Sequence, residues 1–171
     1  MLASEGLIEA LNRQIGREMG ASMQYISIAS YFATETLTEL GRFFYRQADE
    51  ERDHAMRFVK FIVEVDGQVR VPEIAAPQSD FSSAAEAVGK ALKWEEEVTR
   101  QIYELVDIAQ NDSNYIAVRF LDWFVTEQLE EVATMSGLLA VVERAGESGL
   151  LHVEEFLARE GQISELGPPA G

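Results

Sequence analysis

Hydrophobic residues recur along most of the chain at alternating steps of three and four, which is the period of an amphipathic α-helix. The clearest run covers residues 37–65, and one face of it carries Leu37, Leu40, Phe44, Gln47, Glu51, His54, Phe58, Phe61 and Val65. Similar runs cover residues 4–34, 83–110 and 115–145. No alternating strand pattern of useful length is present, so the sequence predicts an all-α fold with four long helices.

The connections between these runs predict how the helices are arranged. Only a few residues separate the first two runs, so we expect an antiparallel hairpin. Residues 66–82 have no helical period and contain Gly67, Pro72 and Pro77. At ~3.3 Å per extended residue, this stretch can span a helix of about thirty residues, ~45 Å long. We therefore predict one long crossover that makes the second and third helices parallel, with a capping box at Ser83 and Glu86 opening the third.

A fifth, shorter run follows the break at residues 146–149. It covers residues 150–160 and is too short to be stable alone, so it must pack on another part of the protein. Residues 161–171 are rich in glycine and proline, and we predict a flexible C-terminal tail there. Residues 1–160 are predicted to form a single domain.

Each long helix carries an acidic residue in the middle of its apolar face. These residues are Glu18, Glu51 with His54 one turn later, Glu95 and Glu131. A carboxylate inside a core is costly unless a charge, a hydrogen bond or a metal compensates it. Positions in the middle of the helices fall at one level of a bundle, so four carboxylates and one imidazole should converge. Such an oxygen-rich set suits iron or manganese and leaves zinc open, and bridging by Glu51 would bring two metals together.

Composition and net charge indicate which kinds of molecule the protein can bind. The chain has 171 residues, no cysteine, and a net charge of −16 from 30 acidic and 14 basic residues. This balance repels nucleic acid and anionic membranes and concentrates cations. The first residues contain neither a basic segment nor an unbroken apolar run, so we expect no signal peptide and no membrane span. The expected location is the cytoplasm.

Across residues 5–160 the chain resembles bacterial non-haem ferritins. The resemblance rests on Glu18, on Met23-Gln-Tyr25, and on residues 44–55, 94–99 and 120–131. It implies a ferritin-like four-helix bundle with a short fifth helix and a homo-oligomeric shell of 24 subunits. It also implies a ferroxidase activity, in which dioxygen or peroxide oxidises Fe(II) and the Fe(III) is stored inside the shell as a hydrated oxide.

The resemblance also implies which residues bind iron. One iron is expected at Glu18, Glu51 and His54, and the second at Glu51, Glu95 and Glu131. Tyr25 and Gln128 match residues that lie beside this centre. Glu50, Glu127 and Glu130 match residues that can hold a third iron on the cavity side. Glu50 and Asp53 match positions that can nucleate the mineral. Judged from the residues alone, Tyr25 could equally be a core tyrosine, and Glu127 and Glu130 could belong to a solvated face.

Two departures argue against haem. Haem-binding bacterioferritins repeat Glu-x-x-His on the fourth helix, where this chain has Gln128-Leu-Glu-Glu131, and carry a methionine at the position of Arg52.

Three other functions stay open. They are another di-metal bundle, such as a rubrerythrin-like peroxidase or a small oxygenase, a cage that stores metal without oxidising it, and a DNA-protecting mini-ferritin. The absence of cysteine disfavours a rubrerythrin, and the acidic charge and fifth helix disfavour the mini-ferritin.

Overall fold

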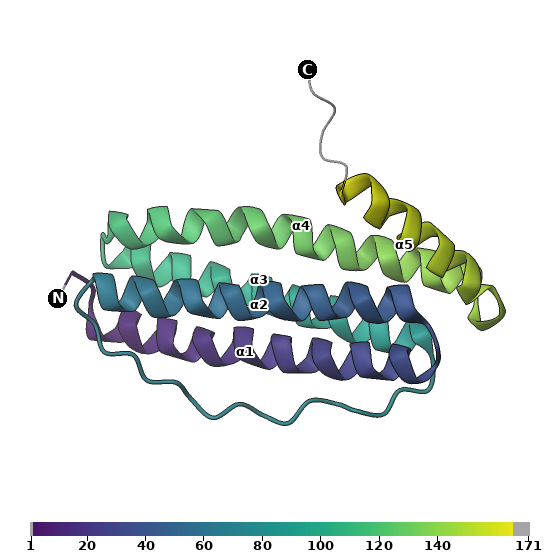
Figure 1. Ribbon diagram of the computed structural model, residues 1–171. Coiled ribbons are helices and arrows are strands. Elements are labelled where there is room, and N and C mark those ends of the chain that lie inside the picture. The colour runs from purple at the N-terminus through teal and green to yellow at the C-terminus, as the bar shows by residue number, and fades with distance from the viewer. Residues whose placement is uncertain (1, 166–171) are drawn as a thin grey trace, which may run out of the picture.

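Four long helices form an elongated bundle in the computed structural model, which describes residues 2–165 (Figure 1). They are α1 (Glu5–Thr34), α2 (Thr38–Glu64), α3 (Ala84–Asn111) and α4 (Tyr115–Ala145). Residues 65–83 run along the outside of the bundle from one end to the other, so α2 and α3 are parallel. The predicted four-helix bundle with one long crossover is confirmed. No helix of the described part is both long and apolar enough to cross a membrane.

The apolar core consists of two clusters, one toward each end of the bundle. The first contains Ile15, Phe58 and Phe124, and the second contains Phe32 and Phe44. Between the two clusters, the buried side chains of each helix are polar or charged. The core is therefore interrupted once, at the middle of all four helices.

Two buried amide side chains of α1 hold the crossover against the bundle. Asn12 donates to the backbone oxygen of Gln68 at 2.9 Å and accepts from the backbone N–H of Arg70 at 2.6 Å. Near the other end, Gln24 donates to the backbone oxygen of Gln78 at 2.9 Å and accepts from its N–H at 3.0 Å. These bonds satisfy backbone groups of a segment that has no helical hydrogen bonds of its own.

The fifth helix, α5 (Leu150–Glu165), follows a short 3₁₀ turn, η1 (Glu147–Gly149), and packs on α2 and α4. Its Glu154 carboxylate accepts the backbone N–H groups of Glu39 and Leu40, each at 2.8 Å. Helix α2 has no side-chain cap of its own, so a residue of α5 caps it. The helix extends to Glu165, five residues beyond the end predicted at residue 160. Residues 166–171 of the predicted flexible tail lie outside the described residues.

Candidate metal centre

The polar level between the two core clusters contains the acidic residues predicted from the sequence. Helices α1, α2, α3 and α4 contribute Glu18, Glu51, Glu95 and Glu131, and the second also contributes His54. All five side chains are buried, with at most 4% of any residue exposed. Burial follows from the helical period, because each residue continues the apolar face of its helix.

These side chains form two overlapping groups of metal-ligating atoms. The first, which we call the first subsite, consists of Glu18, Glu51 and His54, and the second subsite consists of Glu51, Glu95 and Glu131. Within each group, one ligand atom from every residue lies within 4.8 Å of the others. Because Glu51 belongs to both groups, the arrangement suits two cations that share one carboxylate.

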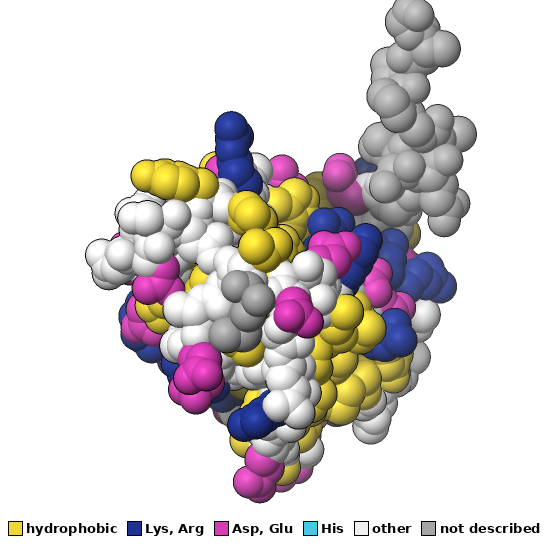
Figure 2. Space-filling view, turned by 90° about the vertical axis from the view of Figure 1, so that its left-hand side faces the viewer, with side chains coloured by type: hydrophobic (Ala, Val, Ile, Leu, Met, Phe, Trp, Pro, Cys, Tyr) yellow, Lys and Arg dark blue, Asp and Glu magenta, His cyan; other side chains and the backbone are white. Residues whose placement is uncertain are grey.

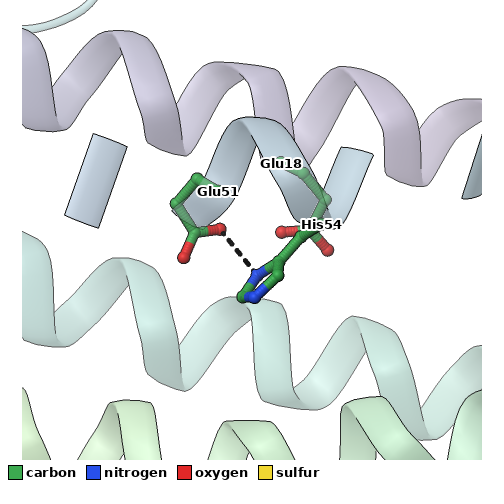
Figure 3. Close-up of side chains that lie close together, drawn as sticks. All are labelled: Glu18, Glu51 and His54. Carbon is green, nitrogen blue, oxygen red and sulfur yellow. Dashed lines mark ion pairs between the residues drawn. The ribbon is translucent and has the colours of Figure 1, made fainter. Parts of the chain in front are cut away.

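Three buried atoms of the first subsite have no hydrogen-bond partner among the described residues. They are Oε2 of Glu18, Oε2 of Glu51 and Nδ1 of His54. The last two face each other at 3.5 Å, as Figure 3 shows. Buried polar atoms are nearly always satisfied in proteins, and a cation between these three atoms would satisfy them together.

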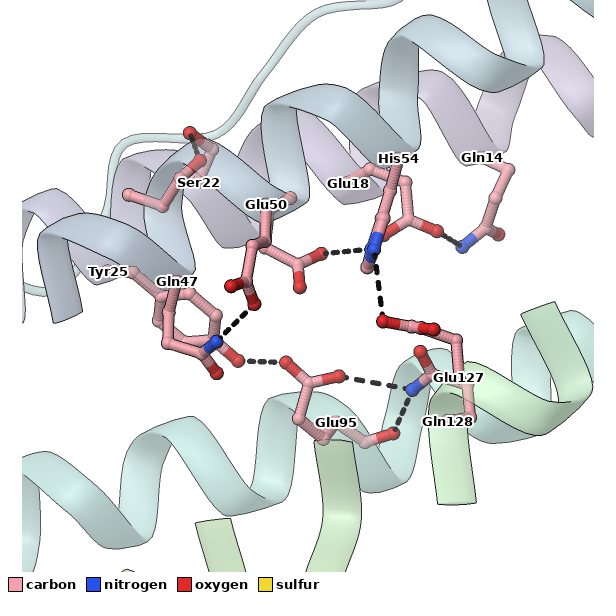
Figure 4. Close-up of polar contacts among 12 residues, drawn as sticks. Gln14, Glu18, Ser22, Tyr25, Gln47, Glu50, His54, Glu95, Glu127 and Gln128 are labelled. Atoms are coloured by element: carbon pink, nitrogen blue, oxygen red, sulfur yellow. Dashed lines mark hydrogen bonds and ion pairs between the residues drawn. The ribbon is translucent and has the colours of Figure 1, made fainter. Parts of the chain in front are cut away.

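The carboxylate of Glu95 is held by two neighbouring side chains (Figure 4). The hydroxyl of Tyr25 donates to its Oε1, and Nε2 of Gln128 donates to its Oε2 at 3.1 Å. Gln128 also donates to Oγ1 of Thr99 at 3.2 Å. The structure thus places Tyr25 and Gln128 beside the centre, as predicted.

Crowding and burial raise the pKa values of the acids. Burial raises the pKa of Glu18 and of Glu51 well above the usual range, and the nearby carboxylates raise them further. Burial, with the negative charges of Glu95 and Glu50, raises the pKa of Glu131 to about 8. Burial also raises the pKa of Glu95, although the hydrogen bonds from Tyr25 and Gln128 oppose this shift. Without a cation, burial therefore favours the protonated form of these carboxyl groups, and Glu131, with a pKa of about 8, keeps its proton near neutral pH.

Comparison with known proteins agrees with this geometry. Residues 8–145 match the ferritin family model, described as a ferritin-like domain. The chain belongs to the ferritin family. The resemblance predicted from the sequence is confirmed.

Similar ferritins come from bacteria and archaea. The chain is 40% identical over 157 residues to ferritin BfrB of Mycolicibacterium smegmatis, covering 92% of this chain and 86% of that protein. It is 36% identical over 155 residues to a bacterial non-heme ferritin of Staphylococcus aureus, covering 90% and 93%. An open pore ferritin from Archaeoglobus fulgidus superposes with a TM-score of 0.88 at 34% identity, covering 91% of this chain and 96% of that one.

In this ferritin, only one of the three acids predicted for a third iron site joins a group of ligating atoms. Glu127 groups with His54 and Glu131, and its Oε1 lies 3.9 Å from Nε2 of His54. Glu50 lies at the solvent edge, where partial burial raises its pKa, and it accepts a hydrogen bond from Gln47. Glu130 is exposed and outside all three groups found among the described residues.

Sequence reasoning missed two side chains that contact the centre. Gln14 is fully buried and donates from Nε2 to Oε1 of Glu18 at 2.8 Å. The ring of Trp123 packs edge-on against the imidazole of His54, with centroids 5.4 Å apart, and the guanidinium of Arg57 lies 3.9 Å from the tryptophan ring centroid. The sequence marks these two residues only by their spacing from predicted site residues. Gln14 lies one helical turn before Glu18, and Trp123 lies one turn before Glu127.

Proposed function

We propose that this ferritin takes up Fe(II), oxidises it to Fe(III) with dioxygen or peroxide, and stores the product as a hydrated ferric oxide. The storage space would be the interior of a hollow homo-oligomeric cage of 24 subunits. The observation that carries this proposal is the pair of buried ligand groups that share Glu51.

The donor set explains why iron would be oxidised at the centre. The first subsite would bind one Fe(II) through Glu18, Glu51 and His54, and the second subsite would bind another through Glu51, Glu95 and Glu131. Four carboxylates together balance the charge of two divalent cations. Hard, anionic oxygen donors stabilise Fe(III) more than Fe(II), which lowers the reduction potential and favours oxidation.

A pair of iron ions suits the stoichiometry of the oxidant. Each Fe(II) supplies one electron, and two electrons with two protons reduce dioxygen to hydrogen peroxide. Iron binding would also release protons from the acids whose pKa values are raised, because a carboxyl group must be deprotonated to bind the metal. Tyr25 and Gln128 would keep Glu95 in place during this exchange.

The oxidised iron needs a route away from the centre. The group formed by His54, Glu127 and Glu131 overlaps the second subsite at Glu131 and the first subsite at His54. Glu127 lies at the edge of the buried region, with 26% of its side chain exposed. We propose that Fe(III) leaves by way of Glu127, and that the neighbouring acids Glu50, Asp53 and Glu130 help the mineral to form.

The test is aerobic Fe(II) oxidation followed by absorbance, comparing the parent with a Glu51→Ala/His54→Ala variant. We expect a fast phase in the parent that the double variant lacks, because the substitutions remove the shared carboxylate and the only imidazole of the centre. A variant of the exposed Glu155, Glu155→Ala, is the control and should keep the fast phase. Equal, slow rates in the parent and the double variant would reject the ferroxidase and leave a passive acidic cage.

A further inference from the structure

The side chain of Gln14 links the protein surface to the first subsite. It is 0% exposed, and its Nε2 donates to Oε1 of Glu18 at 2.8 Å, as Figure 4 shows. At its other end, Oε1 of Gln14 accepts from Nη1 of Arg17 at 3.1 Å. All three residues lie on α1, at spacings of three and four that bring side chains together on one helix.

The chemistry of the neighbours fixes which way the carboxamide points. A guanidinium group can only donate, so the group of Gln14 that faces Arg17 must be the carboxamide oxygen. Reversing the carboxamide would place two donors together at Arg17 and would remove the donor that now faces Oε1 of Glu18. Since Gln14 is fully buried, it has no contact with bulk solvent that could compensate for the reversed orientation.

The two carboxylate oxygens of Glu18 have different environments. Oε1 is bonded to Gln14, whereas Oε2 is buried without a partner and Glu18 belongs to the group with Glu51 and His54. One oxygen is anchored, and the other remains for a cation.

We propose that Gln14 is the positioning residue of the first subsite, and that Arg17 sets the orientation of its carboxamide. This inference rests on the proposed function, because it assumes that the first subsite binds iron. Gln14 holds Glu18 so that Oε2 faces the metal, and it keeps the side chain from turning away when the site is empty. Outer groups of this kind typically change metal affinity by about ten- to a hundredfold.

The second subsite contains a counterpart that serves as an internal control. There Gln128 donates to Oε2 of Glu95, just as Gln14 donates to Oε1 of Glu18. Each subsite thus has one glutamate, on α1 or α3, held by the carboxamide of a buried glutamine. Removing either glutamine should weaken the subsite that it supports and leave the other subsite intact.

Matched methionine variants separate positioning from packing. Gln14→Met and Gln128→Met keep roughly the volume of the side chain and its apolar contacts but remove the donor. Crystals of the parent and both variants are equilibrated with a graded series of Zn(II), which binds similar ligands and is not oxidised. Anomalous scattering then gives the occupancy of each subsite separately, and thermal melting checks that each variant is folded.

We expect Gln14→Met to require about ten- to a hundredfold more Zn(II) to fill the first subsite, with the second subsite unchanged. Gln128→Met should show the opposite selectivity. Arg17→Met should weaken the first subsite to a smaller degree, and Arg17→Lys should restore it, because lysine can also donate to Oε1 of Gln14.

Three results would overturn the inference. The first is a Gln14→Met variant that fills both subsites like the parent, and the second is an equal loss at both subsites, which indicates general loosening. The third is an Arg17→Met variant identical to the parent, which would reject the role of Arg17. A parent that binds no Zn(II) at these residues would instead reject the proposed metal centre itself.

Discussion

The protonation of Glu131 gives the metal-free protein a pH-dependent stability. An ordinary glutamate in an unfolded chain has a pKa of about 4.3, whereas burial and neighbouring charges raise that of Glu131 to about 8. Between these values the unfolded chain has lost the proton and the folded protein keeps it. Folding therefore takes up a proton at Glu131. The contribution of Glu131 to the free energy of unfolding is most favourable below about pH 4, and it is lost as the pH rises toward 8.

We expect Glu131→Gln to flatten this dependence in metal-free protein. When unfolding by denaturant is measured at a series of pH values, the free energy of unfolding of the variant should fall less between pH 5 and 8 than that of the parent. The difference between the two slopes should correspond to at most one proton taken up on folding. Some slope should remain, because burial also raises the pKa values of Glu18 and Glu51. The exposed neighbour supplies the control variant, Glu130→Gln, and identical slopes in all three proteins would contradict the prediction.

The hydrogen bond from Tyr25 should matter for both stability and activity. Tyr25→Phe would leave Oε1 of Glu95 buried without its donor, which costs about 1–3 kcal/mol of unfolding free energy. We also expect a lower rate constant for the fast phase of iron oxidation, because Gln128 alone would then hold Glu95. Denaturant unfolding and stopped-flow absorbance measure the two effects. Tyr45→Phe, at an exposed tyrosine, should change neither, and a Tyr25→Phe variant that behaves like the parent would reject this role.

Particular residues show how far the sequence could predict the centre. Glu18, Glu51 and His54 continue an apolar face at helical spacing, so period alone indicates that they are buried. Gln14 does not continue the face that contains Ile15, yet it is buried, because α1 packs on both α2 and α3 and buries a wider face than one stripe. A single stripe therefore finds the ligands but misses the residue that holds one of them.

At the scale of elements, local signals predicted the helices better than the contacts between them. Ser83 caps α3 by accepting the N–H of Glu86, as the capping box predicts. The carboxylate of Glu86, however, accepts from the N–H and hydroxyl of Ser82 rather than from Ser83. Glu147 and Glu154 cap α3 and α2 from positions far along the chain, and no local pattern marks such partners.

We expect the hydrogen bonds from α2 to Glu154 to help hold α5 against the bundle. Glu154→Ala should expose the N–H groups of Glu39 and Leu40, and losing a helix cap typically costs about 0.5–2 kcal/mol. Hydrogen exchange should become faster in α5 and in the first turn of α2, and remain unchanged in α3. Glu155→Ala removes the neighbouring exposed acid and serves as the control. Unchanged protection in Glu154→Ala would show that apolar packing alone holds α5.

At the scale of the whole molecule, one end of the bundle exposes hydrophobic side chains that a solitary subunit would not favour. Figure 2 looks at the end that contains the turn between α3 and α4 and shows hydrophobic side chains among acidic and polar ones. Leu2, Tyr115 and Ile116 are 63%, 77% and 55% exposed, and they line a hollow of about 640 Å³. Exposed apolar patches of this kind often mark protein interfaces. In the proposed cage, we expect neighbouring subunits to cover this end.

Assembly can therefore be tested without altering the metal centre. Tyr115→Glu/Ile116→Glu would place two carboxylates in the proposed contact, where burying unpaired charges is unfavourable, so we expect smaller particles than the parent cage. Light scattering coupled to size exclusion measures the particle mass. Gln110→Glu adds a charge at an exposed polar position near the same end and should leave the mass unchanged. A double variant that keeps the parent's mass would show that this end is not an interface. If the smaller particles still oxidise Fe(II) quickly but lose iron to a chelator, oxidation belongs to the single subunit and storage belongs to the assembly.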